Sequence, residues 1–172
     1  MELLIPGLLL VAFMVWASTR IKKVAATAFE PEAVETDDFV IQKPEGFLNV
    51  INGDPQFAFE AYSKEYGTEG AEEFRQGRFY LTIREHVTVD DVAAEIKEAA
   101  SETHEDLTEV IGLHRYRRID VKRFEKGIEF CVAYKLAEKG GKVYSVEAVR
   151  LAETSDEFAR KIEVMAASFE LK

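Results

Sequence analysis

The chain has 172 residues, of which 47% are hydrophobic and 31% are charged, and its formal net charge is −10 at pH 7. This surplus of carboxylates disfavours nucleic acid and anionic lipid as partners for most of the surface, because both are polyanions. The single cysteine, Cys131, excludes an internal disulfide and a cysteine-based metal cluster.

The chain opens with an uninterrupted apolar run from Leu3 to Ala17, and basic residues follow it. A helix from Leu3 to Thr19 covers roughly 25 Å, which approaches the thickness of the hydrocarbon core. Trp16 lies near the C-terminal end, where a helix leaves hydrocarbon through the interface. We therefore predict that residues 1–23 form a transmembrane anchor with a juxtamembrane basic cluster. Its marker residues are Leu3, Leu8, Leu10, Phe13, Trp16, Arg20, Lys22 and Lys23.

The position of the basic cluster predicts the orientation of the anchor. Because positive charges stay on the cytoplasmic side, the sequence indicates a single-pass protein of the inner cell membrane with a cytoplasmic C-terminal domain. A cleaved signal peptide is the alternative, since Val15 and Ala17 precede a possible cut before Ser18. Against it, the segment opens with Glu2 where a signal peptide carries positive charge.

Residues 24–38 are rich in carboxylates, which lie on both sides of Pro31 in the sequence. Few large apolar side chains occur there, so the segment predicts an acidic linker that stays extended.

From residue 39 onward the pattern predicts one folded domain over residues 39–172. Residues 39–51 contain two apolar runs divided by Lys43-Pro44-Glu45-Gly46, which indicates strand, turn and strand. Alternating apolar residues predict further strands over residues 56–66 and 77–85. Short glycine-bearing loops then predict an antiparallel meander of residues 116–124, 128–137 and 143–151, with the middle strand central to the sheet.

Helices are predicted to flank this sheet. Thr88 and Asp91 form a capping-box pattern at the start of a helix over residues 88–100. A helix or turn is predicted over residues 105–111, closed by Gly112. A final helix over residues 155–168 begins with Thr154 and Glu157. The fold class is therefore α+β, with an N-terminal transmembrane helix and one domain whose central antiparallel sheet is flanked by helices.

Two short motifs accompany this order of elements: Phe39, Ile41, Lys43, Pro44, Glu45, Gly46 and Phe47 near the start of the domain, and Ala167, Ser168 and Phe169 at its end. With these motifs, the order of the elements resembles that of the PsbP/Mog1-like α/β sandwich superfamily. The resemblance implies a central antiparallel sheet with helices on both sides. It also implies roles that are mostly non-catalytic, such as stabilising a photosynthetic complex, binding a small GTPase or serving in the envelope.

The residues that commonly carry chemistry do not form a motif. His86, His104 and His114 are far apart in sequence and lack the spacing of metal ligands. Cys131 lies between apolar residues in a predicted strand, which indicates a buried structural thiol. We therefore predict no catalytic, cofactor-binding or metal-binding residue, and no cofactor.

One group of cations runs against the acidic background of the domain. The favoured interpretation is a charged edge strand that resists aggregation. The functional hypothesis is that the group binds a protein partner, because a basic strip with an aromatic side chain suits an acidic surface. The strip, called the basic strip below, consists of Arg115, Tyr116, Arg117, Arg118, Lys122 and Arg123.

Together these features predict a membrane-anchored, non-catalytic binding module, which serves as an accessory or assembly factor of a membrane protein complex. It contacts membrane lipid through the N-terminal helix, and its partner is a protein rather than nucleic acid. A small-molecule sensor with a pocket between sheet and helix is the alternative function, and an enzyme is the third.

Overall fold

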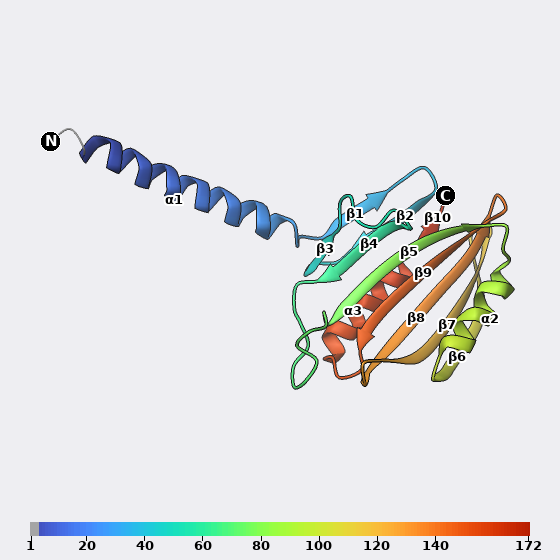
Figure 1. Cartoon of the computed structure of the whole chain (residues 1–172). Coiled ribbons are helices and arrows are strands. Elements are labelled where there is room, and N and C mark those ends of the chain that lie inside the picture. The colour runs from blue at the N-terminus through green and yellow to red at the C-terminus, as the bar shows by residue number, and fades with distance from the viewer. Residues whose placement is uncertain (1–3) are drawn as a thin grey trace.

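The computed structural model describes residues 4–172, apart from the side chains of residues 4–8 and 23–26. The predicted anchor residue Leu3 therefore lies outside the described residues, as do the side chains of Leu8 and Lys23. The first element is helix α1 (Leu4–Thr27), which stands away from the rest of the chain (Figure 1). None of the helices in the described part has the length and hydropathy that crossing a membrane requires.

Two β-sheets and two helices form the domain that follows α1 (Figure 1). The helices are α2 (Val89–Ala99) and α3 (Asp156–Ala167). The strands are β1 (Glu32–Glu35), β2 (Phe39–Lys43), β3 (Phe47–Asn49), β4 (Phe57–Ser63), β5 (Gly77–Glu85), β6 (Glu102–Ile111), β7 (His114–Glu125), β8 (Ile128–Lys139), β9 (Lys142–Leu151) and β10 (Glu170–Leu171).

The larger sheet has seven strands in the order β3-β4-β5-β9-β8-β7-β6, and each neighbouring pair is antiparallel. The predicted meander of β7, β8 and β9 is confirmed, and β8 lies in the interior of the sheet. The middle strand is β9, because β5 pairs with its other side. The two edges of the sheet are therefore β3 and β6.

Both faces of the larger sheet are apolar and covered. On one face, α3 and the smaller sheet contribute side chains such as Met165 to a core that is shielded from water. On the other face, α2 contributes Val92 to a second core. Phe130, Val132 and Tyr134, which alternate along β8, are buried together on the α2 side. Burial of two apolar faces is what makes this one sheet the centre of the domain.

The opposite face of β8 holds a buried lysine. The Nζ atom of Lys135 donates hydrogen bonds to the carbonyl oxygens of Ala167 at 3.0 Å and Phe169 at 2.9 Å. It thereby satisfies acceptors at the C-terminal end of α3, and burial lowers the pKa of Lys135. Cys131, predicted to be buried, is partly exposed on this same face.

The smaller sheet brings the two ends of the domain together on β2. Strand β2 lies between β1 and β10, and Phe39 is opposite Leu171 near the C-terminus. The strands predicted within residues 39–51 are present as β2 and β3, but they do not pair with each other. Instead β3 pairs with β4 in the larger sheet, so the turn before Phe47 carries the chain from one sheet to the other.

Lys43 fixes this crossing point. Its side chain is only 2% exposed, and its ammonium group donates to the carbonyl oxygens of Ala28 at 3.3 Å, Phe47 at 2.9 Å and Glu30. An ammonium has three donors, so each is used. Burial lowers the pKa of Lys43, and the nearby Glu32 and Glu30 act in the opposite direction.

The segment predicted as an acidic linker is largely structured. Helix α1 continues to Thr27, and β1 occupies residues 32–35. Strand β1 pairs with β2 in antiparallel register, with Glu32 opposite Lys43. The linker prediction rested on composition, whereas pairing with β2 and the bonds from Lys43 depend on contacts distant in sequence.

The helix or turn predicted over residues 105–111 is a strand. Strand β6 pairs with β7 along its length and has a bulge between Thr103 and Glu105. Gly112 has a φ of 60° and is the first residue of the two-residue loop between Ile111 and His114. That position in a tight hairpin loop favours glycine, so Gly112 ends a strand rather than a helix.

Capping residues mark where the two helices of the domain, α2 and α3, begin. Thr88 accepts from the backbone N–H of Asp91, and Asp91 accepts from the backbone N–H of Thr88, so the predicted capping box is confirmed. At α3 the cap is Ser155, which accepts from Phe158, and Thr154 donates instead to a strand carbonyl. The predicted start of α3 was therefore one residue early.

Replacing Phe130 with alanine should lower the free energy of unfolding by about 3–5 kcal/mol, because it leaves a cavity between β8 and α2. Phe130 is 0% exposed, and the ring of Phe74 lies edge-on at 5.4 Å. Urea unfolding of the two proteins measures the loss. The control is Phe124→Ala on the neighbouring strand, where the side chain is 56% exposed. A similar loss for both variants would contradict this account of the core.

Candidate functional site

The basic strip lies on β7, an interior strand flanked by β6 and β8. Its side chains alternate between the two faces of the sheet. Tyr116, Arg118 and Lys122 lie on the α3 side, while Arg117 and Arg123 lie on the α2 side. The interpretation as a charged edge strand does not hold for β7, because the edge is β6.

Tyr116 is part of the core rather than of a surface. It is 1% exposed, and its hydroxyl oxygen accepts a hydrogen bond from the backbone N–H of Leu171 at 2.9 Å. The ammonium of Lys135 lies 4.6 Å from the centre of its ring. Burial raises the pKa of Tyr116. This side chain joins β7 to the C-terminal strand.

The cations on the α3 side of β7 are paired with carboxylates. Arg118 contacts Asp120 at 2.9 Å, and Lys122 contacts Glu129 at 3.1 Å. The hydrogen bond that Arg118 donates to Asp120 raises the pKa of Arg118, against the effect of burial. These pairs neutralise the charge that the sequence places on this face.

The arginine on the α2 side, Arg123, belongs to a partly buried network. It contacts Glu125 at 2.8 Å and Glu147 at 3.0 Å, and Arg78 of β5 contacts Glu125 at 3.0 Å. Burial is the largest single effect and raises the pKa of Glu125, but the hydrogen bonds and positive charges of Arg78 and Arg123 together hold that pKa below its ordinary value. The Nε atoms of both arginines are buried without a partner among the described residues.

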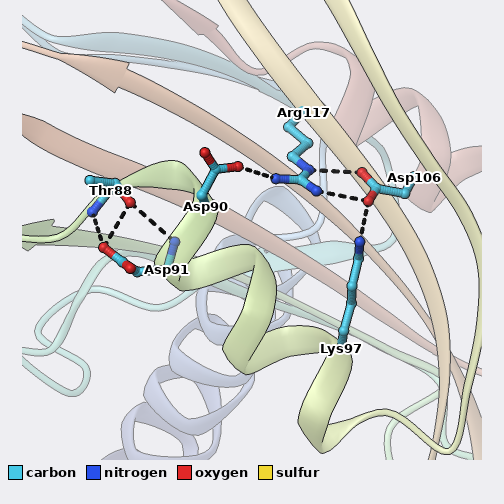
Figure 2. Close-up of polar contacts among 6 residues, drawn as sticks. All are labelled: Thr88, Asp90, Asp91, Lys97, Asp106 and Arg117. Carbon is cyan, nitrogen blue, oxygen red and sulfur yellow. Dashed lines mark hydrogen bonds and ion pairs between the residues drawn. The ribbon is translucent and has the colours of Figure 1, made fainter.

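Arg117 lies at the centre of a second network, which joins α2 to β6 and β7 (Figure 2). Its guanidinium donates to both carboxylate oxygens of Asp106, each at 2.8 Å, and to Asp90 at 2.6 Å. Lys97 of α2 also contacts Asp106. Hydrogen bonds from Arg117 and then Lys97 hold the pKa of Asp106 well below its usual range. The network therefore braces the hairpin of β6 and β7 against α2.

Arg115 differs from the other strip residues because it is exposed and has no carboxylate within ion-pair distance in the described part of the chain. The structure thus does not present the strip as one cationic surface. It leaves one free arginine beside the tip of the hairpin.

The exposed surface of this region is instead the edge strand β6 and the loop after it, called the β6 edge below. All residues of β6 are exposed. Its apolar side chains include Leu107, which is 53% exposed, and Val110, which is 68% exposed; in the adjoining loop Leu113 is 98% exposed. Glu105 and Glu109 have no cation within ion-pair distance among the described residues. Apolar and acidic side chains are therefore free on the same edge.

A sequence signal for this edge was present but was misread. The run Val110-Ile111-Gly112-Leu113 places a glycine between apolar residues, which is a signal for a tight hairpin. Because β6 is exposed on both faces, it lacks the alternation that marks a half-buried strand. Only the loop glycine and the threonines indicated a strand.

One histidine, His104, lines the same groove as Cys131. His86 and His104 are exposed, and His104 lies 3.7 Å from Glu102 at the β6 bulge. Among the described residues, no group of three or more histidine, cysteine or acidic side chains has an arrangement that suits a metal ion. Cys131 lies in a shallow groove between β7 and α3, beside Arg150.

Comparisons with solved structures identify the fold of the domain. LpqN of Mycobacterium tuberculosis, which is involved in cell envelope biogenesis, is 10% identical with a TM-score of 0.61, covering 83% of this chain and 91% of LpqN. Cyanobacterial PsbP (CyanoP) from Synechocystis sp. PCC 6803 is 12% identical with a TM-score of 0.56, covering 83% of this chain and 92% of CyanoP. A mutant of the protein Mog1 is 10% identical with a TM-score of 0.53, covering 83% of this chain and 96% of Mog1.

These likenesses confirm that the domain has a PsbP/Mog1-like fold, as the order of its elements predicted. No protein-family model matches the sequence, and no curated protein is similar to it. The fold is thus shared at a level of identity where side chains at any one site differ.

Replacing Asp106 with asparagine should lower the free energy of unfolding by about 1 kcal/mol at pH 7, because it removes a charge-assisted pair at the surface. A carboxylate whose pKa is lowered by folding stabilises above its unfolded pKa of about 3.9 and loses that effect as pH falls toward the folded pKa. The difference between the two proteins should therefore shrink below pH 4. Urea unfolding at several pH values measures it, with Glu109→Gln as an unpaired control. A difference that is constant down to pH 2 would contradict the pairing.

Proposed function

We propose that this protein is a membrane-attached, non-catalytic binding module, and that it contacts a protein partner through the β6 edge. The observation that carries the proposal is the exposure of the apolar helix α1. Large side chains from Leu9 to Trp16 are more than half exposed, with values of 56–66%. A helix that is apolar on all sides requires lipid or protein around it.

The residues after the apolar run support attachment to a membrane. Trp16 is followed by Arg20, whose guanidinium lies 5.4 Å from the centre of the indole ring. Lys22, two residues after Arg20 on the same helix, is also exposed. Aromatic and basic side chains at a helix end suit the boundary between lipid and water, and the basic end favours the cytoplasmic side. A cytoplasmic domain on a single-pass helix of the inner membrane remains part of the proposal.

The position of the β6 edge supports a role in binding. The chain leaves α1 beside the other edge of the sheet, because the carbonyl oxygen of Phe29 accepts a hydrogen bond from Gly46 just before β3. In the strand order, β3 and β6 are at opposite ends. The β6 edge therefore points away from the attachment point, where a partner has access to it. One protein with this fold, LpqN, is involved in cell envelope biogenesis, which is consistent with work near a membrane.

Membrane attachment is tested by fractionation. The full chain should stay in the membrane pellet after an alkaline carbonate wash. Replacing Leu10 and Phe13 with lysine should release it, because each charge in the hydrocarbon costs about 2.5–3.5 kcal/mol. The control replaces the same residues with valine and leucine. A reporter fused after Lys172 should be cytoplasmic. Release of the unmodified chain by carbonate would exclude attachment through α1.

Partner binding is tested on the tip of the hairpin. Replacing Val110 and Leu113 with aspartate should reduce by about tenfold the recovery of proteins that co-purify from solubilised membranes, since about 1.4 kcal/mol of lost apolar contact has that effect. Thermal unfolding should change little, because exposed substitutions alter stability by less than about 0.5 kcal/mol. The control is Val164→Asp on α3, where the side chain is 55% exposed. Equal recovery with all three proteins would exclude the β6 edge as the binding surface.

A further inference from the structure

The outer side of β6 has no pairing strand among the described residues, because β6 ends the order of the larger sheet. The strand is ten residues long and pairs only with β7. A strand in this position presents unpaired backbone N–H and C=O groups, which are a template for a further strand. The bulge between Thr103 and Glu105 limits the regular part of this template to residues 105–111.

The loop geometry defines which backbone groups point outward. The hairpin closes over a two-residue loop, with Ile111 opposite His114. In such a hairpin the closing pair exchanges hydrogen bonds, and alternate residues along the strand point their N–H and C=O groups away from the partner. The outward groups therefore belong to Asp106, Thr108 and Val110.

Negative charge, from Glu105, Asp106 and Glu109, is what protects this exposed edge against pairing with a like strand. Within residues 105–111 there is no lysine, no proline and no bulge. The strand is also held rigidly, because Asp106 is bound by Arg117 and Lys97 on the α2 side (Figure 2). A rigid edge loses little conformational entropy when a further strand pairs with it.

The side chains on the α3 side of β6 determine which side chains a complementary added strand has. Glu105, Leu107, Glu109 and Ile111 lie on this side, opposite Asp120, Arg118, Tyr116 and His114 of β7. The two glutamates have no cation partner among the described residues. Cross-strand neighbours of opposite charge stabilise a pair, and apolar neighbours do the same. The complementary strand has alternating cationic and apolar side chains on that face.

We propose that β6 accepts an extended segment of a partner protein as an eighth strand of the larger sheet, and that this segment alternates basic and apolar residues on the face that meets Glu105, Leu107 and Glu109. This inference rests on the proposed binding function and specifies its mode and the chemistry of the partner. Backbone hydrogen bonds supply affinity, and the alternating side chains supply specificity.

A second copy of this chain does not fit the same edge. Strand β6 has four carboxylates, those of Glu102, Glu105, Asp106 and Glu109, and it has no lysine or arginine. Pairing two copies brings acidic strands together, and like charges on adjacent strands are destabilising. Charge complementarity therefore favours a basic segment from another protein.

The test uses a capped, dye-labelled peptide of the sequence Val-Thr-Lys-Thr-Val-Thr-Lys and the full chain in detergent micelles. In antiparallel register its lysines lie opposite Glu109 and Glu105, and its second valine lies opposite Leu107. Fluorescence anisotropy measures binding. Methylating the backbone nitrogens of the threonines removes the donors that face β6, so binding should fall at least about tenfold. Methylating the backbone nitrogens of the internal lysine and the second valine leaves the donors to β6 intact, so it should weaken binding less.

Matched variants of the protein test the same contact from the other side. Thr108→Pro removes an outward N–H and leaves the pairing with β7 in place, since an edge strand tolerates proline there. It should weaken peptide binding at least about tenfold, whereas Thr108→Ala should change it by less than about twofold. Replacing Glu105 and Glu109 with glutamine should weaken binding and reduce its dependence on salt. Thermal unfolding verifies that each variant is folded.

Three results would overturn the proposal. Equal binding by the two methylated peptides, or by the Thr108→Pro and Thr108→Ala proteins, indicates attraction to an acidic surface without strand addition. Dimerisation of the chain that Thr108→Pro abolishes identifies a second copy as the occupant. The third result is recovery of a membrane partner that depends on Val110 and Leu113 but not on Thr108. It would support binding through the β6 edge but exclude binding by strand addition.

Discussion

The buried ammonium of Lys43 is the contact on which the assembly of the domain depends. It binds three backbone carbonyls, from the turn after α1, from the residues before β1 and from the first residue of β3. Its own strand, β2, pairs with β1 on one side and with β10 on the other. One side chain therefore holds together the start of the domain, the crossing between the two sheets and, through its strand, the C-terminus. Replacing it with an apolar residue would leave three carbonyl acceptors without their donor, which is costly in a buried site.

The filling of both sheet faces explains where binding is located. Helix α3 and the smaller sheet cover one face, and α2 covers the other. The charged residues near those faces are mostly satisfied within the chain, as the networks around Arg117 and Arg123 show. What remains available is the strand edge far from α1, together with the exposed side of α1 itself. Under the proposed function, the two exposed regions have separate roles, one in attachment and one in recognition.

The parts of the fold that were predictable from sequence are those with local signals. The alternating burial of β4, β5 and β8 and the capping box of α2 were legible because one face of each element is buried or one turn is closed by adjacent residues. Strand β6 was missed because it is exposed on both faces. The basic strip was misjudged because its carboxylate partners, such as Asp106 for Arg117, lie on other elements. A count of charges along one strand does not show which of them are already paired.

The junction between α1 and the domain has a geometric consequence. Only residues 28–31 separate the helix from β1, and the bonds from Lys43 hold two of their carbonyls. A flexible linker of fifteen residues would have a root-mean-square end-to-end distance of about 20 Å, so the domain would have no fixed position relative to α1. Here the seven-stranded order and a strand spacing of about 4.8 Å set β6 roughly 29 Å from β3, beside which α1 ends. The proposed partner would therefore be selected by its distance from the C-terminal end of α1 as well as by its sequence.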